Sequence, residues 1–103
     1  MGMERTITFA GAEPTWPAVR DRITAAGGTV QMRMIDNQPA FPDEEPDSSW
    51  RELRVSLGGG MLTVRREPGR WHVVVWGNAD EALKRDQELL ARVCAEAGGG
   101  TAS

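Results

Sequence analysis

The stretch GGGMLTVRREPGRWHVVVWG, residues 58–77, decides the fold because it alternates turn signals with strand signals. A phosphate-binding loop needs a helix directly after its glycines. Here Gly60 is followed by a period-two pattern in which Leu62 and Val64 alternate with polar residues, so a strand follows instead. We therefore expect Gly58-Gly59-Gly60 to turn a hairpin with glycine at positive φ. Pro68-Gly69 predicts a second, type II turn.

These two turns predict three consecutive strands, at residues 50–57, 61–66 and 71–77. In the last of them one face carries Trp71, Val73 and Val75, and the opposite face carries His72, Val74 and Trp76. We expect Trp71 and Trp76 on opposite faces because five residues separate them. A sheet face open to water normally carries polar residues at alternate positions. The second apolar row therefore predicts a cover, formed either by Trp50 with the loop 36–49 or by another chain.

The residues upstream predict a strand, a helix and a second strand. The segment RTITFA, residues 5–10, has the alternation of a strand. Thr15 is a good N-cap, and Pro17 fits the first helical turn. An apolar stripe follows at Trp16, Val19, Ile23 and Ala26. In the strand 29–35 we expect Val30, Met32 and Met34 on one face. A strand–helix–strand unit predicts two parallel strands, adjacent or one apart.

Segment 36–49, DNQPAFPDEEPDSS, breaks every periodic pattern. It contains three prolines and five acidic residues. Clustered carboxylates can bind Ca²⁺, but an EF-hand loop needs a central glycine, which is missing here. We expect a solvated loop that is the most mobile internal segment of the chain.

The final helix is predicted from Asn78 or Asp80 to Ala97, and the tail 98–103 is predicted to be flexible. Its predicted apolar face consists of Ala82, Leu83, Leu89, Leu90, Val93, Cys94 and Ala97. The element order is then β-α-β-β-β-β-α. We predict one α+β domain over residues 1–103, a two-layer sandwich with a mixed, mostly antiparallel sheet and two helices on one face.

The composition excludes several classes of protein. A net charge of −3 gives no general attraction to nucleic acid. No apolar run approaches the roughly 20 residues that a membrane span needs. The single cysteine, Cys94, cannot form an internal disulfide, so we expect a cytoplasmic location. Arginine supplies all but one of the 12 basic residues. Because arginine codons are often GC-rich, this usage is associated with GC-rich bacterial genomes.

The element order α-β-β-β-α over about residues 15–97 resembles that of double-stranded-RNA-binding domains. Such domains carry a basic cluster at the start of the last helix. Here that helix begins ADEALKRDQE, so acidic residues surround Lys84 and Arg85. Binding to RNA depends on phosphate contacts from basic side chains. We therefore expect no nucleic-acid partner.

The chain offers no recognisable catalytic set, metal site or cofactor motif. His72 is the only histidine, and one histidine with one cysteine makes no zinc set. Cys94 lies on the apolar face of a helix, where cysteine behaves as a small hydrophobe. Neither residue is expected to act in catalysis.

The clearest candidate surface is the sheet face with the second apolar row. Five arginines between residues 50 and 71 adjoin the acidic loop, either to neutralise it or to bind an acidic partner. We predict a non-enzymatic module that binds a protein partner or itself as a homodimer. Its interface would comprise His72, Val74, Trp76, Trp50, Arg54 and Arg65. The alternative is a small-ligand-binding protein or a small enzyme with a pocket between loop 36–49 and the sheet.

Overall fold

The computed structural model describes residues 3–75 and 80–102 of the 103-residue chain. It confirms the α+β class with two helices and one sheet. In chain order the elements are β1 (Met3–Thr8), α1 (Trp16–Ala25), β2 (Gln31–Ile35), β3 (Gln38–Pro39), β4 (Glu52–Ser56), β5 (Met61–Glu67), β6 (Arg70–Val75), α2 (Glu81–Gly98) and β7 (Thr101–Ala102).

The sheet has the strand order β3-β2-β4-β5-β6-β1-β7. Every strand pair within the described residues is antiparallel. Strands β1 and β2 do run in the same direction, but β4, β5 and β6 lie between them. The expectation of a parallel pair adjacent or one apart is therefore wrong. The hairpins β4–β5 and β5–β6 join strands that are consecutive in the sequence, and β1 and β2 pair with the two edges of that unit.

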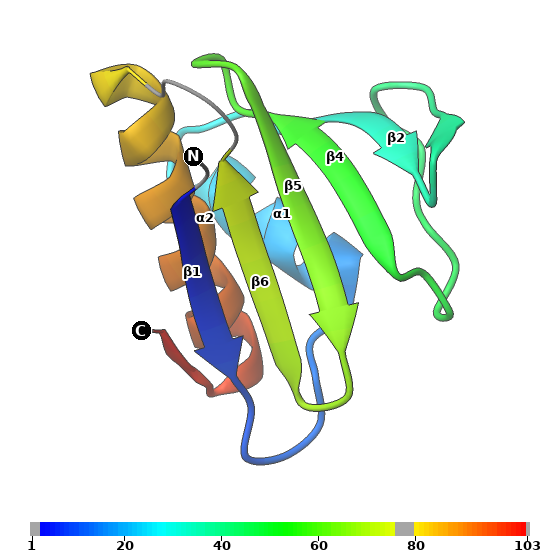
Figure 1. Ribbon diagram of the computed structural model, residues 1–103, viewed down its shortest axis with the longest axis vertical. Helices are drawn as coiled ribbons and strands as arrows, with labels where there is room; N and C mark the ends of the chain where they lie inside the picture. The colour runs from blue at the N-terminus through cyan, green and yellow to red at the C-terminus, as the bar shows by residue number, and fades with distance from the viewer. Residues whose placement is uncertain (1–2, 76–79, 103) are drawn as a thin grey trace.

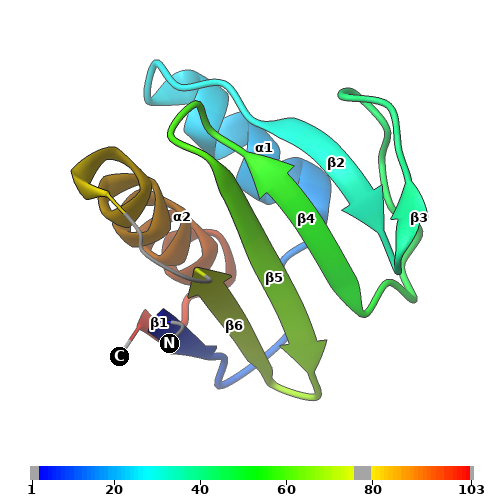
Figure 2. The ribbon, with the colours of Figure 1, turned by 45° about the horizontal axis from the view of Figure 1, so that its top comes forward.

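Both helices lie on the same face of the sheet, as predicted (Figure 1). Figure 2 shows the same two-layer arrangement from a second direction. We call the sheet face against the helices the inner face and the opposite one the outer face. Trp71, Val73 and Val75 of β6 point to the inner face and are fully buried. They pack in one core with residues of β1, β4, β5 and both helices.

The glycine turn 58–60 is a hairpin loop, as predicted, and it joins β4 to β5 beyond the pair Ser56–Met61. Gly58 and Gly60 both adopt positive φ. The backbone N–H of Gly59 donates to Asp86 Oδ2 of α2 at 2.8 Å. A phosphate in this turn would need the same N–H group, which already has an acceptor. The turn is thus fixed against the first half of α2.

A β-bulge in β2 changes the predicted face of one residue. Met32 lies opposite Val55, but Met34 lies opposite Arg54, so the ladder slips by one residue between them. A slip of one residue moves the following side chains to the other face. Met32 therefore points to the core, whereas Met34 lies beside the outward-facing Arg54. The prediction that both methionines share a face is wrong.

The loop 36–49 contains a short strand that the sequence pattern does not predict. Asp36 and Asn37 adopt positive φ and turn the chain into β3, where Pro39 pairs with Met34 at the sheet edge. Proline is tolerated there because an edge strand need not donate on both sides. Asp36 Oδ1 also accepts from the N–H groups of Arg51 and Glu52, at 2.8 and 2.9 Å. The start of the loop is thereby attached to β4. The mobility of the loop stays a prediction.

The helix ends agree with their sequence signals, although parts of the apolar faces differ. The Thr15 side chain accepts from Ala18 N, and the Asp80 side chain accepts from Leu83 N. The stripe of α1 ends at Ile23, because Ala26 is the C-cap and is exposed.

In α2 the predicted Ala82 is exposed, whereas Gln87 is buried and donates to the carbonyls of Met3 and Val73. Part of the predicted tail has regular structure, and its flexibility stays a prediction. Gly98 ends α2, and Thr101 pairs with Thr8 in β7.

The close approach of Gly59 to α2 yields a first prediction. A Cβ at this position would lie 2.6 Å from Asp86 Oδ2 and 2.9 Å from the backbone carbon of Ala82. We expect Gly59→Ala to lower the free energy of unfolding by about 1–3 kcal/mol, the usual range for overpacking. Gly11→Ala is the matched control, since nothing lies within 4 Å of that added atom. Equal denaturation midpoints for the two variants would contradict this packing.

Candidate functional site

Four of the six candidate interface residues lie together on the outer face. Arg54 of β4 lies opposite Thr63 of β5, which lies opposite Val74 of β6. In the neighbouring row Arg65 lies opposite His72. The strand alternation that predicts this grouping is therefore confirmed for Arg54, Arg65, His72 and Val74.

Trp50 does not join them. It is 2% exposed and lies in the core, where its ring meets the ring of Trp71 edge to face with 5.0 Å between centroids. Trp71 belongs to the inner face, so the expectation that Trp50 covers the outer face is wrong. Trp76 lies outside the described residues, and so does the prediction that Trp71 and Trp76 point to opposite faces.

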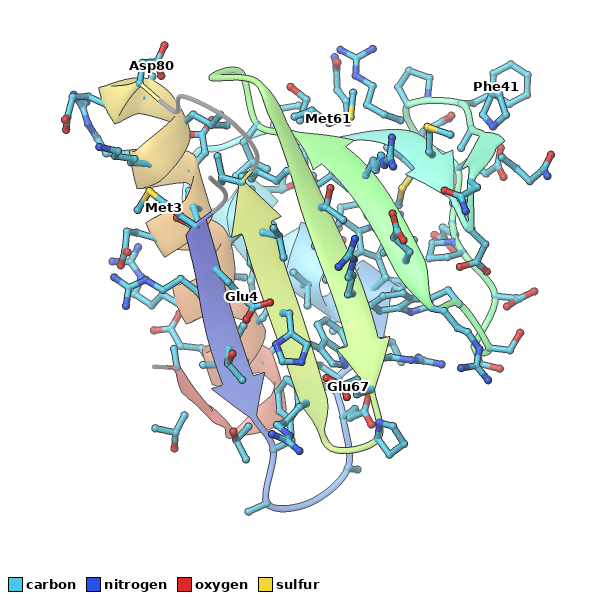
Figure 3. All side chains as sticks on the ribbon, in the orientation of Figure 1. Met3, Glu4, Phe41, Met61, Glu67 and Asp80 are labelled. Atoms are coloured by element: carbon cyan, nitrogen blue, oxygen red, sulfur yellow. The ribbon has the colours of Figure 1, made fainter. Side chains whose placement is uncertain are left out.

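The described residues of the outer face bind one another. His72 Nδ1 lies 3.1 Å from Thr6 Oγ1 and 3.7 Å from Glu4 Oε1, and its Nε2 contacts Glu67. Glu4 and Glu67 approach this point from β1 and from the end of β5 (Figure 3). At the other end of the same cross-strand row, Glu52 lies opposite Arg65 and pairs with Arg65 and Arg54.

These polar side chains surround the apolar residue of the row. Val74 is only 4% exposed. Among the described residues, the second row of β6 is therefore no exposed apolar patch. No helix lies over this face.

A groove of about 760 Å³ lies at one end of the sheet, where three loops meet. Its volume falls in the range of about 300–1,000 Å³ that is common for ligand sites. Its walls come from the segment before α1, the last part of loop 36–49 and the β5–β6 turn. We call this the loop groove, lined by residues 13–17, 46–51 and 66–68. It lies between loop 36–49 and the sheet, where the alternative interpretation of the sequence places a pocket.

Glu13 fixes one wall of the loop groove. Its Oε1 accepts from the indole Nε1 of Trp71 at 2.7 Å, and its Oε2 accepts from Gly69 N at 3.0 Å. One carboxylate thereby connects the segment before α1 to β6 and to the β5–β6 turn. Nothing in the sequence around Glu13 indicates that it is a hydrogen-bond acceptor for Trp71. Only a buried Trp71, whose N–H needs an acceptor, could have indicated it.

Two arginines lie side by side in the loop groove. Arg66 N donates to Arg51 O at 2.8 Å, which continues the β4–β5 ladder. The guanidinium of Arg66 lies over the ring of Trp50, 4.7 Å from its centroid, and donates to Ser48 O at 2.8 Å. Arg51 is exposed, and its guanidinium has no ion pair within the part of the chain that the structure describes.

Each carboxylate that lines the loop groove already has a donor. Glu13 accepts from Trp71 and Gly69, and Glu67 contacts His72. Asp47 Oδ1 accepts from Ser49 Oγ at 2.7 Å and from Ser49 N at 2.9 Å. The hydrogen bonds from Ser49, with a smaller effect of Arg66, hold the pKa of Asp47 below its ordinary value. Arg51 is therefore the one charged side chain of the groove lining that has no hydrogen bond or ion pair within the described residues.

The described residues bring together no cluster that could hold a metal ion. Within residues 3–75 and 80–102, no group of three or more His, Cys, Asp or Glu side chains could hold a metal ion. Over the same part of the chain, neither helix is long and apolar enough to cross a membrane. Cys94 is buried in α2 and does not line the loop groove.

Comparison with known proteins does not add a family. No family model, no curated protein and no solved structure matches the chain. The function of the candidate site can therefore be inferred only from its own geometry.

The burial of Cys94 yields a second prediction. Burial raises the pKa of the thiol from 9.0 to about 12. We expect a thiol-specific reagent at pH 8 to modify Cys94 only as fast as the protein unfolds, because the thiolate is the reactive form. The same shift predicts a stability that is present below pH 9 and decreases as the pH rises toward 12. Rapid modification of the native chain would contradict this burial.

Proposed function

We propose that the chain is a non-enzymatic binding module and that the loop groove holds its ligand, a small molecule or short segment with an apolar body and an anionic group. The observation that carries this proposal is the unpaired guanidinium of Arg51 beside a concave surface. The carboxylates around it are already hydrogen-bonded, so an added anion meets an available cation.

The other walls of the groove favour a ligand with an apolar part. Four prolines, at positions 14, 17, 46 and 68, line the loop groove together with Trp16 and Trp50. Proline fixes its own backbone, so these walls lose little conformational entropy when a ligand binds. An aromatic or aliphatic body fits this lining better than a polar one.

The groups that line the groove favour binding without catalysis. Thr15 caps α1 with its hydroxyl, and the Ser49 hydroxyl donates to Asp47. Nucleophilic catalysis needs a hydroxyl or thiol next to a general base. The only histidine of the chain, His72, contacts the Thr6 hydroxyl on the outer face, so no histidine lines the loop groove as a general base.

A second candidate is a protein-interaction module that uses the outer face. It is favoured by one observation, namely that both helices lie on the other face and leave the outer face of the seven-stranded sheet without a helix. Against it stands the mutual pairing of charged residues such as Glu52, Arg54 and Arg65 on that face. The variant Arg54→Glu in the next subsection separates it from the first candidate.

The proposed function yields a third prediction, with phenylacetate as the probe. We expect phenylacetate, added to the ¹⁵N-labelled full chain, to shift the NMR signals of residues that line the loop groove, including the indole N–H of Trp16. The neutral analogue phenylacetamide should bind more weakly. Arg51→Gln should reduce the affinity for phenylacetate about tenfold, since a hydrogen bond to a charged group contributes about 1.5–3 kcal/mol.

Arg22→Gln is the matched control. Arg22 is exposed on α1 and does not line the groove. Signal shifts confined to other parts of the chain, or equal affinity of the Arg51 and Arg22 variants, would contradict the proposal.

A further inference from the structure

Phe41 is the most exposed large apolar residue among those that the structure describes. Its exposed fraction is 74%, and its ring points away from the body of the molecule (Figure 3). Exposure of a large aromatic residue is unfavourable in water. Single exposed apolar residues are common, however, so exposure alone does not indicate a binding role for Phe41. The local structure around Phe41 is more informative.

A reciprocal pair of hydrogen bonds holds this residue in a turn. Glu44 N donates to Phe41 O at 3.0 Å, and Phe41 N donates to Glu44 Oε1 at 3.2 Å. The first bond closes a β-turn with Pro42 and Asp43 at its centre, and proline favours that position. The turn thus fixes the backbone of an aromatic residue whose side chain is mostly exposed to solvent.

The charges next to Phe41 are acidic. After Pro42 come Asp43, Glu44 and Glu45. Glu44 accepts from Phe41 N, and Glu45 pairs with Arg20 at 3.0 Å, which raises the pKa of Arg20. Asp43 has no ion pair among the described residues. The segment 41–45, which we call the acidic turn, therefore presents one aromatic ring and one unpaired carboxylate.

The acidic turn and the loop groove can complement one another at one charge pair, because Arg51 is the cation without a partner in a lining that also carries Glu13, Asp47 and Glu67. The groove offers an unpaired Arg51 beside proline and tryptophan walls. The turn offers an unpaired Asp43 beside an exposed ring. Charge complementarity of this kind selects a partner and its orientation, while the buried ring supplies most of the affinity.

We propose that the loop groove of one copy receives the acidic turn of a second copy, with Phe41 against the prolines and Asp43 on Arg51. Reciprocal insertion would close two copies into a dimer. This proposal rests on the proposed function, since it names the segment that the same groove would bind.

The first test uses a synthetic peptide of residues 39–45, PAFPDEE, against the ¹⁵N-labelled full chain. The peptide should shift the same groove signals as phenylacetate, and a peptide with Phe41→Ala should bind at least tenfold more weakly. If phenylacetate binds in the groove and the peptide does not, self-association is overturned and the proposed function stands. If neither binds there, both proposals fail. Binding of the peptide alone would overturn only the small-ligand form of the proposed function.

The second test is sedimentation equilibrium of the intact protein over a range of concentrations. The mass of the wild type should rise from that of a monomer toward that of a dimer. Phe41→Ala and Arg51→Glu should stay monomeric with unchanged melting temperatures, because both side chains are exposed. Arg54→Glu on the outer face should associate like the wild type. A monomeric wild type, or association lost only in Arg54→Glu, would overturn the proposal.

Discussion

The hydrogen bond from the Trp71 indole to Glu13 is the contact on which the site end of the molecule depends. Trp71 is fully buried, and its ring meets Phe9 at 5.4 Å and Trp50 at 5.0 Å, both edge to face. A buried indole N–H without an acceptor is costly, so the core can hold this residue only if Glu13 reaches it. Glu13 also accepts from Gly69 N, so the same carboxylate sets the segment before α1 against the β5–β6 turn. Two walls of the loop groove are fixed in this way.

The two faces of the sheet are stabilised by different interactions. On the inner face, apolar side chains from β1, β4, β5 and β6 pack against both helices, and their burial is the main favourable contribution. On the outer face, one polar row, Glu52–Arg65–His72–Thr6, crosses four neighbouring strands. Exposed ion pairs of this kind each add little to stability. They do keep the face hydrated, and this favours the loop groove over the outer face as the binding site.

Features set by neighbouring residues could be predicted from the sequence. The glycine hairpin, the turn at Pro68-Gly69 and the caps Thr15 and Asp80 follow from local backbone preferences. The faces of β6 follow from strict alternation over the described strand. The grouping of Arg54, Arg65, His72 and Val74 was predictable for the same reason.

Features set by distant residues could not be predicted. The bulge before Met34 depends on how β2 pairs with β4, and β7 depends on the free edge of β1. Trp50 is as apolar as an outer-face cover would be, but it is drawn into the core by Trp71 across two strands. Glu13 is one of 15 acidic residues, and nothing in its neighbours marks it as the acceptor for an indole 58 residues away. The loop groove needs all three loops at once and so has no local signature.

The central claim, that Glu13 holds the groove end together through Trp71, is tested most directly by the free energy of unfolding of two variants. Glu13→Ala leaves both the indole N–H and Gly69 N–H without acceptors, so a loss of about 1–3 kcal/mol is predicted. Glu13→Gln keeps one oxygen for the indole and should lose less. If both variants unfold within about 0.5 kcal/mol of the wild type, the range of ordinary surface substitutions, the claim is contradicted.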